Sequence, residues 1–266
     1  MYIHNLSPIL IDFGFLEIRW YSLAYIFGII IGWWLGVKIF RFKIKSKNIT
    51  TLKVKDFDDL ISYLIVSIIV GGRLGYVIFY NLNYYLNNPI DIIKIWQGGM
   101  SFHGALIGII VGTYIFASEK KISTLFFLDI IACVAPIGIF FGRIANFINS
   151  ELYGVPSNIF WSVIFPNVDN LPRHPSQLYE AFMEGIILFL ILVFFTFKNK
   201  IKTGYCSSLF LIFYGFFRII AEQFREPDAH IGLIFYTFSM GTFLSFIMIF
   251  FGLLITLNVK KNNAKT

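Results

Sequence analysis

Charged residues are scarce in this sequence of 266 residues, and that scarcity decides which solvent the chain faces. Asp, Glu, Lys and Arg make up 14% of the residues and hydrophobic residues 57%, and the mean hydropathy is +0.74. A domain that folds in water needs more charge on its surface, so the composition excludes an ordinary soluble protein and is typical of one embedded in a membrane.

Cysteine, histidine and catalytic motifs are also scarce. The two cysteines, Cys133 and Cys206, fall in apolar stretches, which predicts small buried side chains rather than a disulfide. No GxSxG, P-loop or dinucleotide motif is present. The histidines lack the spacing of a metal site, so we expect no metal and no cofactor. They are His4, His103, His174 and His230.

Long apolar runs, in contrast, are abundant. A helix needs about 20 apolar residues to cross the hydrocarbon core, and seven such windows predict an all-α polytopic protein, a single integral membrane domain with seven transmembrane helices. The first 17 residues include Asp12 and Glu17 and lack a basic segment, so we expect the first span, not a cleaved signal peptide, to target the chain. The windows are 18–40, 57–80, 98–117, 123–146, 177–197, 205–225 and 232–257.

The basic residues predict the orientation of these spans. Of the 22 lysines and arginines, 15 lie at the inner end of span 1, in the connections after spans 1, 3 and 5 and in the tail. Because basic connections stay in the cytoplasm, we expect the amino terminus and the 147–176 loop outside and the carboxyl terminus inside. This pattern also explains the net charge of +7. A nucleic-acid-binding stripe over 38–55 is the alternative, which the adjacent spans disfavour, so we expect no nucleic-acid partner.

Two glycine ladders recur at a spacing of four residues, which aligns each of them on one helical face. Small residues in such a row let membrane helices pack closely, and we favour this interpretation over a substrate groove. The ladders are Gly28, Gly32 and Gly36, and Gly104, Gly108 and Gly112.

Polar residues of the spans gather at one depth. With the predicted orientation, nine of them from six spans lie in the outer half of the membrane, and Asp129 is the main exception. Such residues are costly in lipid and usually face a bundle interior, so they predict one polar chamber open to the outer leaflet, where they bind substrate. They are Tyr21, Arg73, His103, Arg143, Asn146, Gln177, Glu180, Arg218 and Glu222.

Each charge also has a plainer interpretation. Arg73 and Arg225 can snorkel to headgroups, and His103 can be a buried imidazole with its hydrogen bonds satisfied. Glu222 follows Arg218 by one turn on the stripe Tyr214, Arg218, Glu222 and Arg225, and can simply neutralise it.

Arginines around one chamber nevertheless favour a phosphate ligand, which reaches an outer-leaflet chamber most simply as a phospholipid headgroup. No resident nucleophile with its own base is evident, so a second substrate would bring one.

The stretch GRIANFINSELYG at 142–154 resembles the signature of the bacterial prolipoprotein diacylglyceryl transferases. Its matching positions are Arg143, Asn146, Phe147, Asn149, Glu151 and Gly154; Ala145 stands where many members have glycine. Further similar segments follow in family order: IRWYSLAY at 18–25, VGGRLGYVIFY at 70–80, GGMSFHGALIG at 98–108, RHPSQLYEAFMEG at 173–185 and YGFFRIIAEQFREPD at 214–228.

The resemblance implies a seven-helix enzyme of the bacterial inner membrane with its active site towards the periplasm. It implies transfer of the diacylglyceryl group of phosphatidylglycerol to the lipobox cysteine thiol of a prolipoprotein, forming a thioether and releasing glycerol phosphate. His103 is then the expected base, and Arg143 and Arg218 the groups that stabilise the departing phosphate. By resemblance, Tyr21, Asn146, Glu151 and Tyr214 line the same site. A lipid transporter and a phospholipase that uses water are the alternatives.

Overall fold

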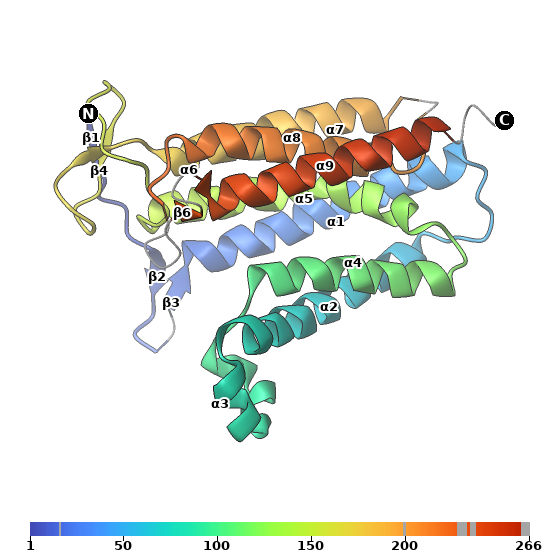
Figure 1. The fold of residues 1–266 in the computed structure, drawn as a ribbon, viewed down its shortest axis with the longest axis horizontal. Coiled ribbons are helices and arrows are strands. Elements are labelled where there is room, and N and C mark those ends of the chain that lie inside the picture. Colours follow the sequence, from blue (N-terminus) through green and yellow to red (C-terminus); the bar gives the residue numbers. More distant parts are fainter. Residues whose placement is uncertain (16, 199–200, 228–232, 235–237, 262–266) are drawn as a thin grey trace. The chain divides into compact units, whose positions relative to one another are not determined.

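The computed structural model describes residues 1–15, 17–198, 201–227, 233–234 and 238–261, and the chain is mostly helical (Figure 1). The helices are α1 (Trp20–Ser46), α2 (Lys55–Tyr80), α3 (Leu82–Asn87), η1 (Pro89–Ile93), η2 (Ile95–Gln97), α4 (Phe102–Glu119), α5 (Thr124–Ile148), α6 (Ser176–Glu180), η3 (Ala181–Ile187), α7 (Leu188–Thr196), α8 (Tyr205–Glu222) and α9 (Met240–Lys261). The strands are β1 (Tyr2–Ile3), β2 (Ile9–Asp12), β3 (Glu17–Arg19), β4 (Val163–Ile164), β5 (Pro172–Arg173), β6 (Leu233–Ile234) and β7 (Phe238–Ser239).

Six helical segments of the described residues are long and apolar enough to cross a membrane. This confirms a polytopic helical membrane protein. Helix α4 overlaps the third predicted window, 98–117; its stretch Gly104–Glu119 is apolar but shorter than the six segments. The six segments are Trp20–Ser46, Lys55–Tyr80, Thr124–Ile148, Ser176–Thr196, Tyr205–Glu222 and Met240–Val259.

The chain forms two compact units, residues 40–128 and residues 1–39 with 129–266. In the first unit, α2 and α4 pack backbone to backbone. A Cβ atom on Gly104 would lie 2.2 Å from the carbonyl oxygen of Gly71, and one on Gly108 would lie 2.1 Å from that of Ser67. The second glycine ladder therefore serves close helix packing, as predicted.

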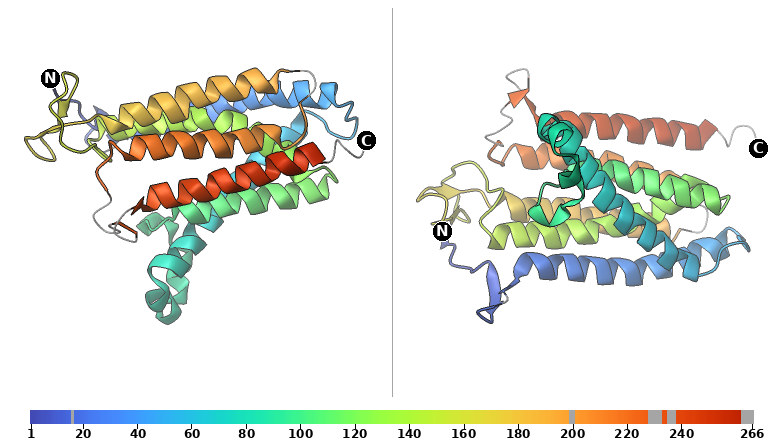
Figure 2. Two further views of the ribbon diagram at one scale, coloured as in Figure 1. Left: turned by 45° about the horizontal axis from the view of Figure 1, so that its top comes forward. Right: turned by 90° about the horizontal axis from the view of Figure 1, so that it is seen from below.

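In the other unit, glycines again mark close approach. Gly28 of α1 meets Gly138 of α5, with 3.3 Å between an added Cβ and the Gly138 Cα. Helices α8 and α9 lie side by side (Figure 2), and a Cβ on Gly215 would lie 2.8 Å from the carbonyl oxygen of Ser245. A side chain at Gly28 or Gly215 would therefore push the helices apart.

Two buried polar arrangements brace this unit. The carboxylate of Asp129 accepts hydrogen bonds from the backbone amides of Gly204 at 2.9 Å and Ser207 at 2.8 Å. It thereby satisfies free amides at the start of α8. Cys133 and Cys206 are buried and form no disulfide within the described residues, as predicted, and both thiols contact the hydroxyl of Thr196.

A small sheet joins the amino terminus to the 147–176 loop. Strand β1 pairs in parallel with β4, and β4 pairs antiparallel with β5. His4 follows β1 and is buried between the rings of Phe147 and Phe165, both at 5.2 Å between centroids. Burial lowers the pKa of His4. The sequence indicated only a loop here, because strands of two residues are too short to show alternation.

Candidate functional site

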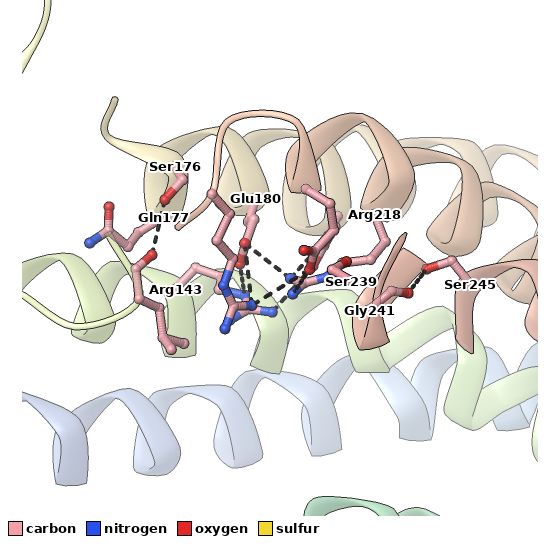
Figure 3. A network of polar contacts seen from close by, with 12 residues as sticks. Arg143, Ser176, Gln177, Glu180, Arg218, Ser239, Gly241 and Ser245 are labelled. Carbon is pink, nitrogen blue, oxygen red and sulfur yellow. Dashed lines mark hydrogen bonds and ion pairs between the residues drawn. The ribbon is translucent and has the colours of Figure 1, made fainter. Parts of the chain in front are cut away.

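One buried ionic network connects α5, α6, η3, α8 and the residues just after α8. Three arginines and three glutamates form it, so its formal charge is zero. Figure 3 shows its centre, where the side chains of three helices point toward one another. Buried charges persist only when paired in this way. The members are Arg143, Arg218, Arg225, Glu180, Glu184 and Glu222.

Glu180 is the carboxylate that the network shares. Its Oε2 lies 2.7 Å from Nε of Arg143, and its Oε1 lies 3.0 Å from Nη1 of Arg218. Glu184 lies farther away, at 3.6 Å from Nη2 of Arg143 and 3.7 Å from Nη1 of Arg218. Both carboxylates are fully buried. Glu180 therefore holds the two arginines in fixed relation to each other.

The helices place these groups in two different ways. On α8, Arg218 and Glu222 are four residues apart and bind directly, as the predicted stripe requires. Arg225 follows the end of α8 and lies 3.9 Å from Glu222. Glu180 ends α6, whereas Glu184 lies in the π-helical turn η3. Such turns are rare and often occur at functional sites.

Arg143 is the most accessible cation of the network. Its side chain is 17% exposed, against 10% for Arg218 and 8% for Arg225. Within the described residues its Nε binds Glu180, its Nη2 lies only loosely near Glu184, and its Nη1 has no protein partner. One edge of its guanidinium is thus available to an anion, since an arginine presents five N–H donors.

A second cluster lies at the end of α5. The side-chain amide of Asn146 donates to the Tyr21 hydroxyl at 3.0 Å and to Oε2 of Glu151 at 3.2 Å, and Asn149 donates to Oε1 at 3.4 Å. Within the described residues, amides hold the carboxylate of Glu151, whereas Glu180 and Glu184 pair with Arg143.

The 149–154 segment connects the cluster to the network. In this segment, the backbone carbonyl of Glu151 accepts a hydrogen bond of 2.7 Å from the side-chain amide of Gln177. Gln177 precedes Glu180 on α6. Ser150 and Leu152 adopt left-handed backbone conformations, with φ of 58° and 54°. Such conformations are uncommon for residues with a side chain and require support from their surroundings.

Arg173 and Gly154 fix the rest of this loop. Arg173 donates to the Gly154 carbonyl at 2.9 Å, pairs with Glu226 at 3.0 Å and with Asp169, and lies over the Tyr153 ring. A Cβ on Gly154 would lie 2.4 Å from each of two backbone oxygens, those of His174 and Phe224. The loop is therefore bound to the chain that follows α8.

Residues 8–258 match the prolipoprotein diacylglyceryl transferase family. The chain belongs to that family. Among its relatives are proteins named phosphatidylglycerol–prolipoprotein diacylglyceryl transferase. That of Rickettsia felis is 51% identical over 250 residues, 93% of this chain and 95% of the relative. That of Rickettsia typhi is 51% identical over 254 residues, 95% and 96%.

Most of the predicted site residues of this family member fall in one compact unit. Two do not, since Arg73 and His103 belong to residues 40–128. Arg73 is buried, and its guanidinium donates to backbone carbonyls between Asp91 and Gly99. From the sequence, Arg73 is expected to bind substrate or to snorkel to a lipid headgroup, and these contacts with backbone carbonyls are not predicted. His103 lies in the first turn of α4, and its side chain lies outside the described part of the structure.

Several residues of the site were not among our predictions. Glu184, Asn149 and Arg173 all lie in the motifs that carried the family resemblance, yet their partners come from distant segments. Arg225 was interpreted as a possible headgroup anchor and is instead part of the network. The available signal was helical spacing: Glu184 follows Glu180 by four residues, as Glu222 follows Arg218.

Proposed function

We propose that the chain transfers the diacylglyceryl group of phosphatidylglycerol to the thiol of the lipobox cysteine in prolipoprotein signal peptides. The observation that carries this proposal is the guanidinium edge of Arg143 that has no partner among the described residues, in an ionic network that is neutral overall. Family membership supports the reaction, and the Rickettsia relatives are named for it.

We propose further that α4 is a seventh span and that the active site faces the periplasm, in the inner membrane. The lysine asymmetry supports an outer amino terminus and a cytoplasmic carboxyl terminus. The network and the Asn146 cluster lie near the ends of α5 and α6 that border the 147–176 loop and near the end of α8. A headgroup could therefore reach Arg143 from the outer leaflet of the membrane.

In the proposed reaction the thiolate sulfur attacks the glycerol carbon that bears the phosphate. The carbon–sulfur bond forms, the carbon–oxygen bond breaks, and its electron pair leaves on glycerol phosphate. Charge grows on the phosphate as the bond breaks, so a guanidinium that donates there stabilises the transition state more than the bound lipid. Arg143 has the free donors for this role. Arg218, held by three carboxylates, keeps Glu180 and hence Arg143 in position.

The thiol proton must be removed, since a cysteine has a reference pKa of about 8.5 and the thiolate is the nucleophile. His103 is the base that we propose. Tyr21, Asn146, Glu151 and Tyr214 are proposed to bind substrate, with Gln177, Glu180 and Glu222 supporting them. Asn146 and Glu151 form a hydrogen-bonded pair that could meet the hydroxyl groups of the headgroup.

Mass measurement of a lipobox peptide tests the proposal. Purified full-length protein in phosphatidylglycerol vesicles should add one diacylglyceryl group to a cysteine peptide and none to the matched serine peptide. A phospholipase would consume phosphatidylglycerol without any peptide. A transporter would redistribute labelled lipid and leave the peptide mass unchanged. Either of those two results would contradict the proposal.

A further inference from the structure

Gly241, in the first turn of α9, has a tightly fixed backbone. Ser239 caps the helix, with its hydroxyl oxygen 3.1 Å from the amide of Thr242, and such a cap defines where a helix begins. The hydroxyl of Ser245 donates to the carbonyl of Gly241 at 2.7 Å. The chain at Gly241 is thus held from both sides and has little freedom to move away from its neighbours.

This backbone lies directly against the ionic network (Figure 3). A Cβ atom on Gly241 would lie 2.3 Å from Oε1 of Glu222 and 3.3 Å from Nε of Arg218. Real Cβ atoms do not approach other heavy atoms to 2.3 Å, because that is well inside van der Waals contact. The backbone of Gly241 is not in the left-handed region, so space rather than conformation requires glycine here.

Gly241 differs from the glycines that serve helix packing. A Cβ on Gly215 or Gly252 would lie within 3 Å of a backbone carbonyl oxygen of the facing helix, so a side chain there would separate α8 and α9. At Gly241 the nearest atoms belong to the carboxylate of Glu222, the end of a flexible side chain. A methyl group at Gly241 would therefore displace this carboxylate rather than the helix.

The displaced oxygen is the one that binds Arg218, since Oε1 of Glu222 accepts from Nη2 of that arginine. The other terminal nitrogen of Arg218, Nη1, binds Glu180, which also binds Arg143. We propose that Gly241 is a positioning residue whose missing side chain keeps Glu222 on Arg218 and so keeps the arginine pair in place for the reaction. This inference rests on the proposed function.

Kinetics with a rescue variant test the role in the reaction. Gly241→Ala should lower kcat by about 10-fold or more while KM changes less, because small misplacements at a site are costly and the substrate contacts are retained. Adding Glu222→Asp shortens the acid by one methylene group and makes room for the new methyl group. The double variant should recover at least about threefold in kcat. A Gly241→Ala enzyme near wild-type turnover, or a double variant without recovery, would overturn the proposal.

Thermal unfolding in detergent tests the contact without any activity assay. Glu222→Asp should lower Tm less in the Gly241→Ala background than in the wild type, because the two changes act on one contact. Simple addition of the two losses would contradict the contact. Gly138→Ala is the matched control: an added Cβ there meets open space, so kcat should be unchanged. If wild-type protein lipidates no peptide, the proposed function fails, and the unfolding cycle still decides the contact.

Discussion

The guanidinium Nε of Arg143 lies 2.7 Å from the carboxylate Oε2 of Glu180, which is itself fully buried. This pair orients the arginine through one nitrogen and leaves another edge of its planar group unused. A fixed cation with free donors is preorganised for an anion, because neither side chain has to move when charge develops.

Glu180→Gln should be the single change that most destabilises the network. It removes one charge and leaves Arg143 and Arg218 without their shared partner, and breaking a buried pair costs about 3–5 kcal/mol. We expect a lower Tm and a loss of turnover of at least about 10-fold. Glu184→Gln is the matched control with longer contacts, at 3.6 and 3.7 Å, and should cost less. Equal effects would contradict the central place of Glu180.

Stability at low pH should depend on Asp169 in the outer loop. The hydrogen bonds from Arg173 lower the pKa of Asp169 below its reference value of about 3.9. The contribution of this pair to the free energy of unfolding is therefore fully present above about pH 4 and is lost as the pH falls through the folded-state pKa of Asp169. The stability of Asp169→Asn should fall less steeply with decreasing pH than that of the wild type, with Asp12→Asn as control. An Asp169→Asn protein whose stability falls with pH as steeply as the wild type would refute this.

Two glycines of the 142–154 motif should respond oppositely to alanine. An added Cβ at Gly142 meets open space in α5, so Gly142→Ala should preserve or raise Tm, since alanine favours a helix by about 1 kcal/mol. At Gly154 the same atom would lie 2.4 Å from two backbone oxygens. Gly154→Ala should lower Tm by several degrees and disorder the loop. A stable Gly154→Ala protein would show that the loop can relax.

Much of this site follows from spacing within single helices, and little of what crosses between helices does. The stripe of Arg218 and Glu222 and the packing role of the Gly104 ladder follow from helical periodicity. The partner of Arg143 does not, because Glu151 and Glu180 are equally plausible acids until the helices are placed in space. The role of Gly241 depends on a contact between two helices, and the π turn η3 has no simple sequence signal.

Accessibility of single cysteines should reveal the orientation. In a background with Cys133→Ala and Cys206→Ala, a membrane-impermeant thiol reagent added outside should label Asn170→Cys and not Lys47→Cys. The background itself should keep turnover within a few fold, because both thiols are buried without a disulfide and the nucleophile comes with the peptide. Labelling of position 47 alone would reverse the proposed topology.

Turnover of Arg143→Lys in phosphatidylglycerol vesicles tests the central claim most directly. A lysine ammonium can pair with Glu180, and so can satisfy a purely structural or headgroup-anchoring role. It cannot also present a second planar edge to two phosphate oxygens. We expect the variant to insert normally, with Tm close to wild type, and to lose at least about 10²-fold in kcat, with a smaller effect on lipid binding. Near-normal turnover of a stable Arg143→Lys protein would contradict a phosphate-binding role for Arg143.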